Sequence, residues 1–301
     1  MGKQFVIYSA CIGSYDNISQ PKYIDDRFDY ILFTDELKEM HIGVWEVRKV
    51  DYSNSDKTRI ARYVKTHPHT LLPQYEATVW LDANLEITSP YIYERCVELS
   101  KSKIQLASIK HPMRDCIYDE AYWVYGLDSE IKIFEWCHFL RSIGYPRHNG
   151  LYETNVLFRI NDENVADLNE QWWKAILEHS RRDQLSLNYL LWNSAIPQDY
   201  ILPPGEHAVN SKHICKRLHN NVASTSGRRS LQQTKWEHFR NRCRMGLPSK
   251  HDSFQKVHYF LYQLPVKMGM ALLNLWTIYA IIIYGPRIKY EAHLRHKQNN
   301  G

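Results

Sequence analysis

The chain has 301 residues, of which 44% are hydrophobic and 24% are charged. This composition excludes an intrinsically disordered protein and allows either one large α/β domain or two smaller ones. The six cysteines are scattered without a C-x-x-C pair, which argues against a zinc site or a disulfide framework and favours reduced thiols. The opening run FVIYSACIG is too short and too strand-like for a signal peptide, so we expect a cytoplasmic protein.

The formal net charge of +5 is unevenly distributed. Residues 212–250 contain ten Lys or Arg and one acidic residue, which leaves the rest of the chain at −4. A basic block of this kind attracts the phosphates of a nucleotide, a nucleic acid or an anionic membrane, although it can also be a solvated face without a partner. No nucleic-acid-binding motif accompanies the block, so we do not expect nucleic acid as the partner.

The first half of the chain alternates strand and helix patterns. Strands are predicted over 5–12, 28–35, 43–50, 78–82 and 104–110, and helices over 56–67 and 91–102, the first of these capped by Asn54 or Ser55. This order predicts an open, mostly parallel sheet with helices on both faces. Ligands of such sheets bind outside the carboxyl ends of the strands.

The rest of the chain divides into the end of this domain and an extension. An aromatic helical region over 119–150 precedes a strand over 153–160 and helices over 164–180 and 181–192. We predict a core domain over 1–220 and a helical extension over 221–301 that is first basic and then hydrophobic. Its uncharged stretch, 268–284, is short for a bilayer-spanning helix, so we expect it to lie at an anionic membrane surface or to pack on the domain.

The run Asp82-Ala83-Asn84 ends the strand predicted over 78–82. A carboxylate that ends an apolar strand is costly to desolvate unless it meets a counter-ion, a cap or a metal. Two oxygen-bearing side chains at positions i and i+2 can share Mg²⁺ or Mn²⁺, and such an ion can stabilise a diphosphate as a leaving group. Most triplets of this kind are turns or caps, so the motif alone does not decide between these possibilities.

Four motifs in this order carry a resemblance to a known family: YVKTHPHTLLPQYEATVWLDANLEI, HPMRDCIYDEA, GLYETNVLFR and RRDQLSLNYLLW. Over residues 4–220 the chain resembles the glycosyltransferase-like domain of plant mucilage and turgor-related proteins and of bacterial surface-polysaccharide loci. More distantly, it resembles the retaining, glycogenin-like GT-A glycosyltransferases. The resemblance implies a GT-A-like fold over 1–220 that binds a nucleotide sugar.

The resemblance also implies a role for particular residues. Base and ribose contacts are expected from Ala10, Tyr15 and Asp16, and contacts to diphosphate or sugar from Arg62 and Lys65. Metal ligands are expected from Asp82 and Asn84, where Asn replaces a second Asp, with His219 as the first candidate for a third ligand and His213 as the second. Sugar or acceptor contacts are expected from Arg114, Asp115 and Glu120, unless these form an ordinary ion-pair cluster.

Four further residues are implied beside the reacting carbon: Glu153, Asn155, Asp183 and Gln184. Asp183 is expected closest to the reaction, either stabilising an oxocarbenium-like state or acting as a base. The alternative for Asp183-Gln184 is a purely structural role as a helix cap.

The expected function is therefore metal-dependent transfer of a sugar from a nucleotide-diphosphate donor to a glycan or lipid-linked glycan in surface polysaccharide synthesis. The polysaccharide is expected to be a capsule or a lipopolysaccharide. The transfer is expected to retain the anomeric configuration and to take place at the inner face of the membrane. One alternative is a ceramidase-like hydrolase on the same scaffold, for which no separate hydrolase signature is present. Another is a non-catalytic protein that binds an anionic ligand. A sugar nucleotidyltransferase is disfavoured because the loop SACIGSYDN has one glycine and no phosphate-cradling pattern.

Overall fold

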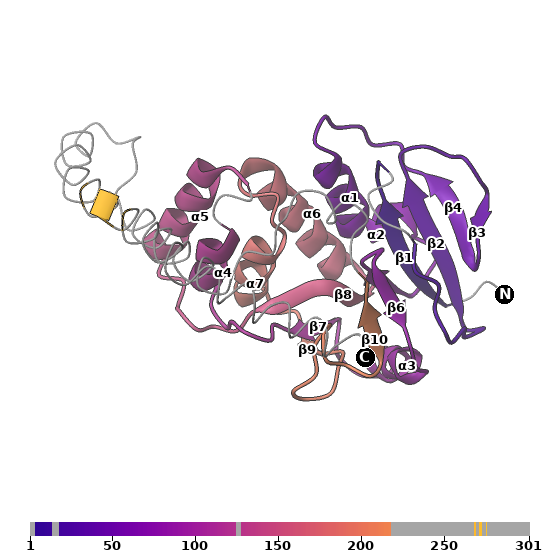
Figure 1. Cartoon of the computed structure of the whole chain (residues 1–301). Coiled ribbons are helices and arrows are strands. Elements are labelled where there is room, and N and C mark those ends of the chain that lie inside the picture. Colours follow the sequence, from indigo (N-terminus) through magenta and orange to yellow (C-terminus); the bar gives the residue numbers. More distant parts are fainter. Residues whose placement is uncertain are drawn as a thin grey trace. The chain divides into compact units, whose positions relative to one another are not determined.

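The computed structural model describes residues 4–13, 18–124 and 128–217, together with the isolated positions 268, 271, 272 and 275 (Figure 1). The chain separates into two compact units, one of residues 1–121 and 140–224 and the other of residues 122–139 and 225–301. Every described strand belongs to the first unit. The predicted extension over 221–301, and with it the predicted membrane attachment, falls almost entirely outside the described residues. Within the described part, no helix has both the length and the apolar character that crossing a bilayer requires.

Eight strands form one mixed sheet in the order β3-β4-β2-β1-β5-β8-β7-β9. Their bounds are β1 Phe5–Cys11, β2 Phe28–Thr34, β3 His41–Ile42, β4 Trp45–Lys49, β5 Ala77–Leu81, β7 Leu106–Lys110, β8 Tyr152–Ile160 and β9 Gln198–Tyr200. Strands β4, β2, β1 and β5 are parallel, whereas β8 lies antiparallel between β5 and β7. The predicted α/β fold with a mostly parallel sheet is therefore confirmed.

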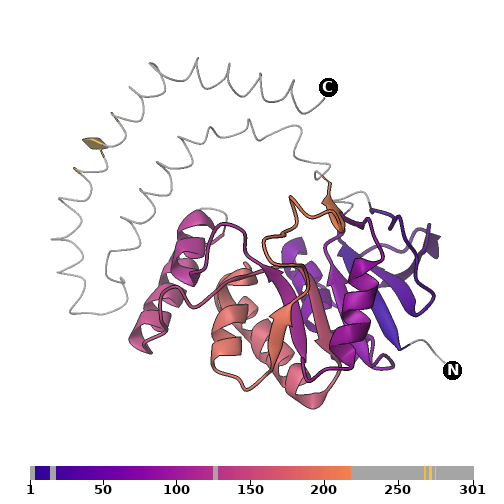
Figure 2. The same ribbon diagram turned by 90° about the horizontal axis from the view of Figure 1, so that it is seen from below.

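Helices of the first unit cover both faces of this sheet (Figure 1, Figure 2). The described helices are α1 Lys57–Thr66, α2 Pro68–Leu71, α3 Tyr91–Ser100, α4 Ile117–Val124, α5 Glu130–Ser142, α6 Glu163–Glu178 and α7 Gln184–Trp192, of which α4 in part and α5 for the most part belong to the second unit. Because side chains alternate along a strand, Phe5 and Ile7 of β1 share one hydrophobic core with α3, while Val6 and Tyr8 share the other with α1, α6 and α7. The sheet is thus packed between two hydrophobic cores, which hold the ends of its strands in place.

The first helix begins later than its predicted cap implies. Asp56, not Asn54 or Ser55, is the N-cap, and its Oδ1 accepts a hydrogen bond from the Thr58 amide at 3.0 Å. The Asn54 side chain accepts from the Asp56 amide at 2.9 Å, which closes the turn before the helix. Helix α1 therefore places Arg62 and Lys65, three residues apart, on one face.

A second, two-stranded ladder pairs β6 (Leu85–Ile87) with β10 (Ile214–Lys216). The register sets Lys216 opposite Leu85, three residues beyond Asp82. The sequence patterns did not predict this ladder, because three-residue strands are too short to show a period. It returns the end of the first unit to the strand ends that carry the site.

Candidate active site

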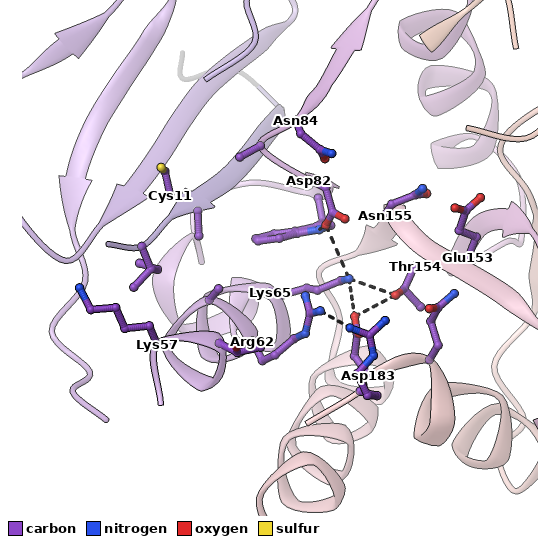
Figure 3. Close-up of a pocket in the computed structure, with 18 of the residues that line it drawn as sticks. Cys11, Lys57, Arg62, Lys65, Asp82, Asn84, Glu153, Thr154, Asn155 and Asp183 are labelled. Carbon is purple, nitrogen blue, oxygen red and sulfur yellow. Dashed lines mark hydrogen bonds and ion pairs between the residues drawn. The ribbon is translucent and has the colours of Figure 1, made fainter. Parts of the chain in front are cut away.

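A pocket of about 440 Å³ lies at the carboxyl ends of β1 and β5 (Figure 3). In the sheet β1 has β2 on one side and β5 on the other, so the strand order reverses at this point. A crevice at such a reversal is where open α/β sheets bind their ligands. Helix α1, strand β8, the start of α7 and Lys216 complete the lining.

Asp82 follows the last residue of β5 and lines the pocket with a side chain that is 34% exposed. Its Oδ1 accepts a hydrogen bond from Nε1 of Trp80 at 2.7 Å, and its Oδ2 has no partner among the described residues. The backbone is fixed as well, because the Asp82 amide donates to the Asn155 carbonyl at 2.9 Å and the Leu85 amide donates to the Asp82 carbonyl at 2.8 Å. One carboxylate oxygen is thus held and the other is available to a ligand.

Asn84 also lines the pocket, but it is more firmly engaged than Asp82. Only 3% of the residue is exposed. Its Nδ2 donates to the Arg217 carbonyl at 2.9 Å, and the Arg217 amide donates to the Asn84 carbonyl at 2.7 Å. These bonds orient the amide and leave Oδ1 as the atom that Asn84 can offer to a cation.

Lys65 and Asp183 form a buried ion pair in the floor of the pocket (Figure 3). Lys65 Nζ lies 2.5 Å from Asp183 Oδ2 and 3.9 Å from Asp82 Oδ1. Thr154 bridges the pair, since its hydroxyl accepts from Lys65 Nζ at 3.1 Å and donates to Asp183 Oδ2 at 2.8 Å. Arg62 binds the other Asp183 oxygen at 3.2 Å. The Asp183 carboxylate is therefore surrounded by donors.

The electrostatics of this pair follow from burial and neighbouring charges. Burial alone would raise the pKa of Asp183, but the charges of Arg62 and Lys65 outweigh it and hold that pKa well below its usual range. Burial lowers the pKa of Lys65, against the opposing effect of Asp183 and Asp82. Although Asp183 is the N-cap of α7, its side chain makes no capping hydrogen bond. The carboxylate is directed to the two cations instead of the helix amides.

An irregularity in β8 shapes the opposite wall. The register against β7 shifts between Ser108, which pairs with Leu157, and Ile109, which pairs with Glu153. The Ser108 hydroxyl donates to the carbonyls of Glu153 at 3.1 Å and Val156 at 2.8 Å, so it stabilises the irregular backbone. Bulges of this kind redirect side chains and occur often beside active sites. Here the affected segment supplies three consecutive pocket residues, Glu153, Thr154 and Asn155.

Two of these residues have buried polar atoms without partners. Within the described residues, Glu153 Oε2 and both amide atoms of Asn155 make no hydrogen bond, whereas the other Glu153 oxygen, Oε1, lies 3.6 Å from Lys216 Nζ. An unpaired buried polar group costs about 1–3 kcal/mol, so a fold that keeps three of them beside a pocket is suited to a polar ligand. Together with Asp82 Oδ2 they form an oxygen-rich lining, which is the donor chemistry that Mg²⁺ or Mn²⁺ prefers. The residues present therefore fit a divalent cation and a polar ligand.

The remaining predicted residues fall into three groups. Ala10, Arg62 and Gln184 line the same pocket. Tyr15, Asp16 and His219 lie outside the described residues. His213 does not line the pocket: its ring stacks on Tyr91 at 4.2 Å, and its Nδ1 lies 2.7 Å from the Ser89 hydroxyl.

Arg114, Asp115 and Glu120 also lie outside the pocket lining. Arg114 Nε donates to Glu120 Oε2 at 2.6 Å, and Glu120 is only 3% exposed, so this is a buried ion pair and not a surface one. Asp115 is exposed and pairs with His148 at 2.7 Å. Their predicted sugar contacts stay a prediction.

A separate group of possible metal ligands occurs close to Asp115. Cys116, Asp119 and His148 bring potential ligand atoms within 4.8 Å of one another. Asp119 is already paired with Arg147 at 3.1 Å and His148 with Asp115 at 2.7 Å. These pairings satisfy the group without an ion.

Sequence reasoning missed several residues that line the pocket: Lys57, Thr154, Arg182 and Lys216. The three basic residues among them, with Arg62 and Lys65, give the lining five basic side chains. Its acidic side chains are three: Asp82, Glu153 and Asp183. Arg182 precedes the predicted motif Asp183-Gln184, so its charge was a usable signal. Lys216 lies within the basic block, but its position in the pocket depends on strand β10, which no sequence pattern predicts.

Comparison with known proteins agrees with the sequence motifs. Residues 1–128 match the family model described as TOD1/MUCI70, glycosyltransferase-like domain. This match confirms the resemblance for the part of the chain that carries Arg62, Lys65, Asp82 and Asn84, whereas Glu153 and Asp183 lie beyond it. Among solved structures, the apo structure of the bifunctional glycosyltransferase WbbM is similar, with 11% identity and a TM-score of 0.41. The alignment covers 67% of this chain and 38% of that one, so this chain spans well under half of WbbM. No curated protein matches the chain.

Proposed function

We propose that the chain is a metal-dependent glycosyltransferase that uses a nucleotide-diphosphate sugar as donor. The observation that carries the proposal is the pocket at the β1–β5 reversal, where Asp82 offers one unpaired carboxylate oxygen beside an excess of basic side chains. The match of residues 1–128 to a glycosyltransferase-like domain supports the reaction class. A glycan or lipid-linked glycan acceptor in surface polysaccharide synthesis, and retention of configuration, rest on the sequence resemblance.

The lining suggests how the donor is bound. Arg62, Arg182 and Lys216 supply positive charge for the diphosphate, and Arg can donate to two oxygens at once. Asp82 and Asn84 would hold Mg²⁺ or Mn²⁺, whose chemistry is to neutralise the diphosphate as it departs. The unpaired atoms of Glu153 and Asn155 suit the hydroxyl groups of a sugar. Ala10, near the end of β1, would lie beside the nucleoside.

The test is a thermal-shift panel of nucleotide sugars with and without Mn²⁺. We expect one donor to raise the melting temperature only when Mn²⁺ is present, and Asp82→Ala to abolish that shift. Asp51→Ala is the matched control, because Asp51 is an exposed acid that follows the end of β4 and does not line the pocket. A donor shift that is independent of Mn²⁺, or that persists in Asp82→Ala, would contradict the proposal.

A further inference from the structure

The position of Lys65 raises a problem for any cation bound at Asp82. Lys65 Nζ lies 3.9 Å from Asp82 Oδ1, and its side chain is 1% exposed. Shortening this contact by about 1 Å would give a hydrogen-bonded ion pair, because such pairs close at about 2.7–2.9 Å. Lys65 is thus a built-in competitor for the carboxylate that the proposed function assigns to the metal.

The structure also shows what holds Lys65 back. Its ammonium is 2.5 Å from Asp183 Oδ2, and Thr154 fixes both partners of that bond. The ammonium lies 5.4 Å from the centre of the Trp80 ring and 6.0 Å from that of Trp172, so aromatic walls limit its movement. The Asp183 backbone is anchored in turn, since its carbonyl accepts from Nε1 of Trp172 at 3.1 Å.

Asp183 is poorly placed to be the reacting base that the resemblance implies. Its side chain is 5% exposed, one oxygen is bound by Lys65 and Thr154, and the other lies 3.2 Å from Arg62. A carboxylate with both oxygens committed to cations is a weak proton acceptor. The same contacts make it an effective counter-ion.

We propose that Asp183 is a positioning residue that retains Lys65 and so keeps the Asp82 carboxylate free for a divalent cation. This inference rests on the proposed function, because it assigns the cation to Asp82. Without Asp183, Lys65 has Asp82 as its nearest remaining carboxylate among the described residues. The lysine then closes onto Asp82 and competes with the metal.

The test is a double-mutant cycle on Mn²⁺ affinity, measured with the full chain and Mn²⁺ alone by electron paramagnetic resonance. Asp183→Asn should weaken Mn²⁺ binding about tenfold, because two like charges a few ångströms apart repel by more than 1 kcal/mol. Lys65→Met, which removes the competitor, should tighten binding about tenfold for the same reason. In the Lys65→Met background, Asp183→Asn should change the affinity by less than about threefold, because no lysine is left to release.

Each other outcome overturns the inference. An equal loss on Asp183→Asn in both backgrounds would make Asp183 a direct contributor to metal binding, and no loss in either would leave it without influence on Asp82. If Asp183→Asn does not fold, Lys65→Met decides alone, since unchanged or weaker Mn²⁺ binding refutes competition. A wild-type chain that binds no Mn²⁺ would overturn the proposed function itself. Wild-type binding that Asp82→Ala abolishes, without the expected cycle, would overturn only the role of Asp183.

Discussion

The buried pair of Lys65 and Asp183 predicts a large and specific loss of stability. In Asp183→Asn, the Lys65 ammonium stays 1% exposed but loses its partner at 2.5 Å. Removing one member of a buried ion pair costs about 3–5 kcal/mol, because the remaining charge is left uncompensated. Lys65 would keep the Thr154 hydroxyl at 3.1 Å and would close onto the Asp82 carboxylate, which lies 3.9 Å away in the wild type and is 34% exposed, so we expect the lower end of that range, about 3 kcal/mol.

The control is the same substitution in an exposed pair. Asp199 lies 2.7 Å from Arg95, but its side chain is 44% exposed. Surface pairs contribute about 0–1 kcal/mol, so Asp199→Asn should cost less than 1 kcal/mol. The double variant Lys65→Met/Asp183→Asn should be more stable than Asp183→Asn alone, because it removes the uncompensated charge as well.

Urea unfolding measures these differences. With a slope of about 2–3 kcal/mol/M, a loss of about 3 kcal/mol lowers the unfolding midpoint by about 1–1.5 M. Asp199→Asn should shift it by less than about 0.5 M. Equal shifts for Asp183→Asn and Asp199→Asn would refute the reasoning, because they would show that Lys65 does not depend on Asp183 for its charge balance.

Two further predictions concern pH and the support of Asp82. The pKa of Asp183 is lower in the folded chain than the usual value of about 3.9, so at acidic pH the unfolded chain binds a proton on this carboxylate more readily than the folded chain does. The stabilisation that Asp183 contributes is therefore lost as pH falls below about 5, and urea midpoints between pH 7 and pH 3 should fall more steeply for the wild type than for Asp183→Asn. Parallel curves for the two proteins would contradict this. Trp80→Phe removes the donor 2.7 Å from Asp82 Oδ1 and should weaken Mn²⁺ binding about tenfold. The control is Trp45→Phe, because Nε1 of Trp45 donates to the Ser19 carbonyl and not to Asp82, so Mn²⁺ binding should not change. Equal affinities for the two variants would disprove the orienting role of Trp80.

The parts of the fold that the sequence predicts are those with a local signal. The apolar run that ends at Asp82 shows both a buried strand and its carboxyl end, and the rule for open α/β sheets then places the site there. The helix of Arg62 and Lys65 is likewise legible from its polar and apolar spacing. Its cap was misplaced because Asn54, Ser55 and Asp56 are all capable caps, and only the backbone decides among them.

The features that the sequence does not predict depend on contacts between residues that are distant along the chain. Lys65 and Asp183 are separated by 118 positions, and nothing local shows that both face one floor. The irregular register of β8 that presents Glu153 and Asn155 depends on pairing with β7, which a single strand pattern does not contain. The resemblance named Asp183 as important, but only the contacts distinguish a reacting group from a counter-ion.

The most direct measurement of the central claim is release of a nucleoside diphosphate from a panel of nucleotide sugars, with an acceptor-glycan extract and with or without Mn²⁺. The proposed function predicts release from one donor that requires Mn²⁺, is lost in Asp82→Ala and is retained in Asp51→Ala. Release that Asp82→Ala leaves unchanged, or no release from any donor by a folded wild-type chain that binds Mn²⁺, would contradict it.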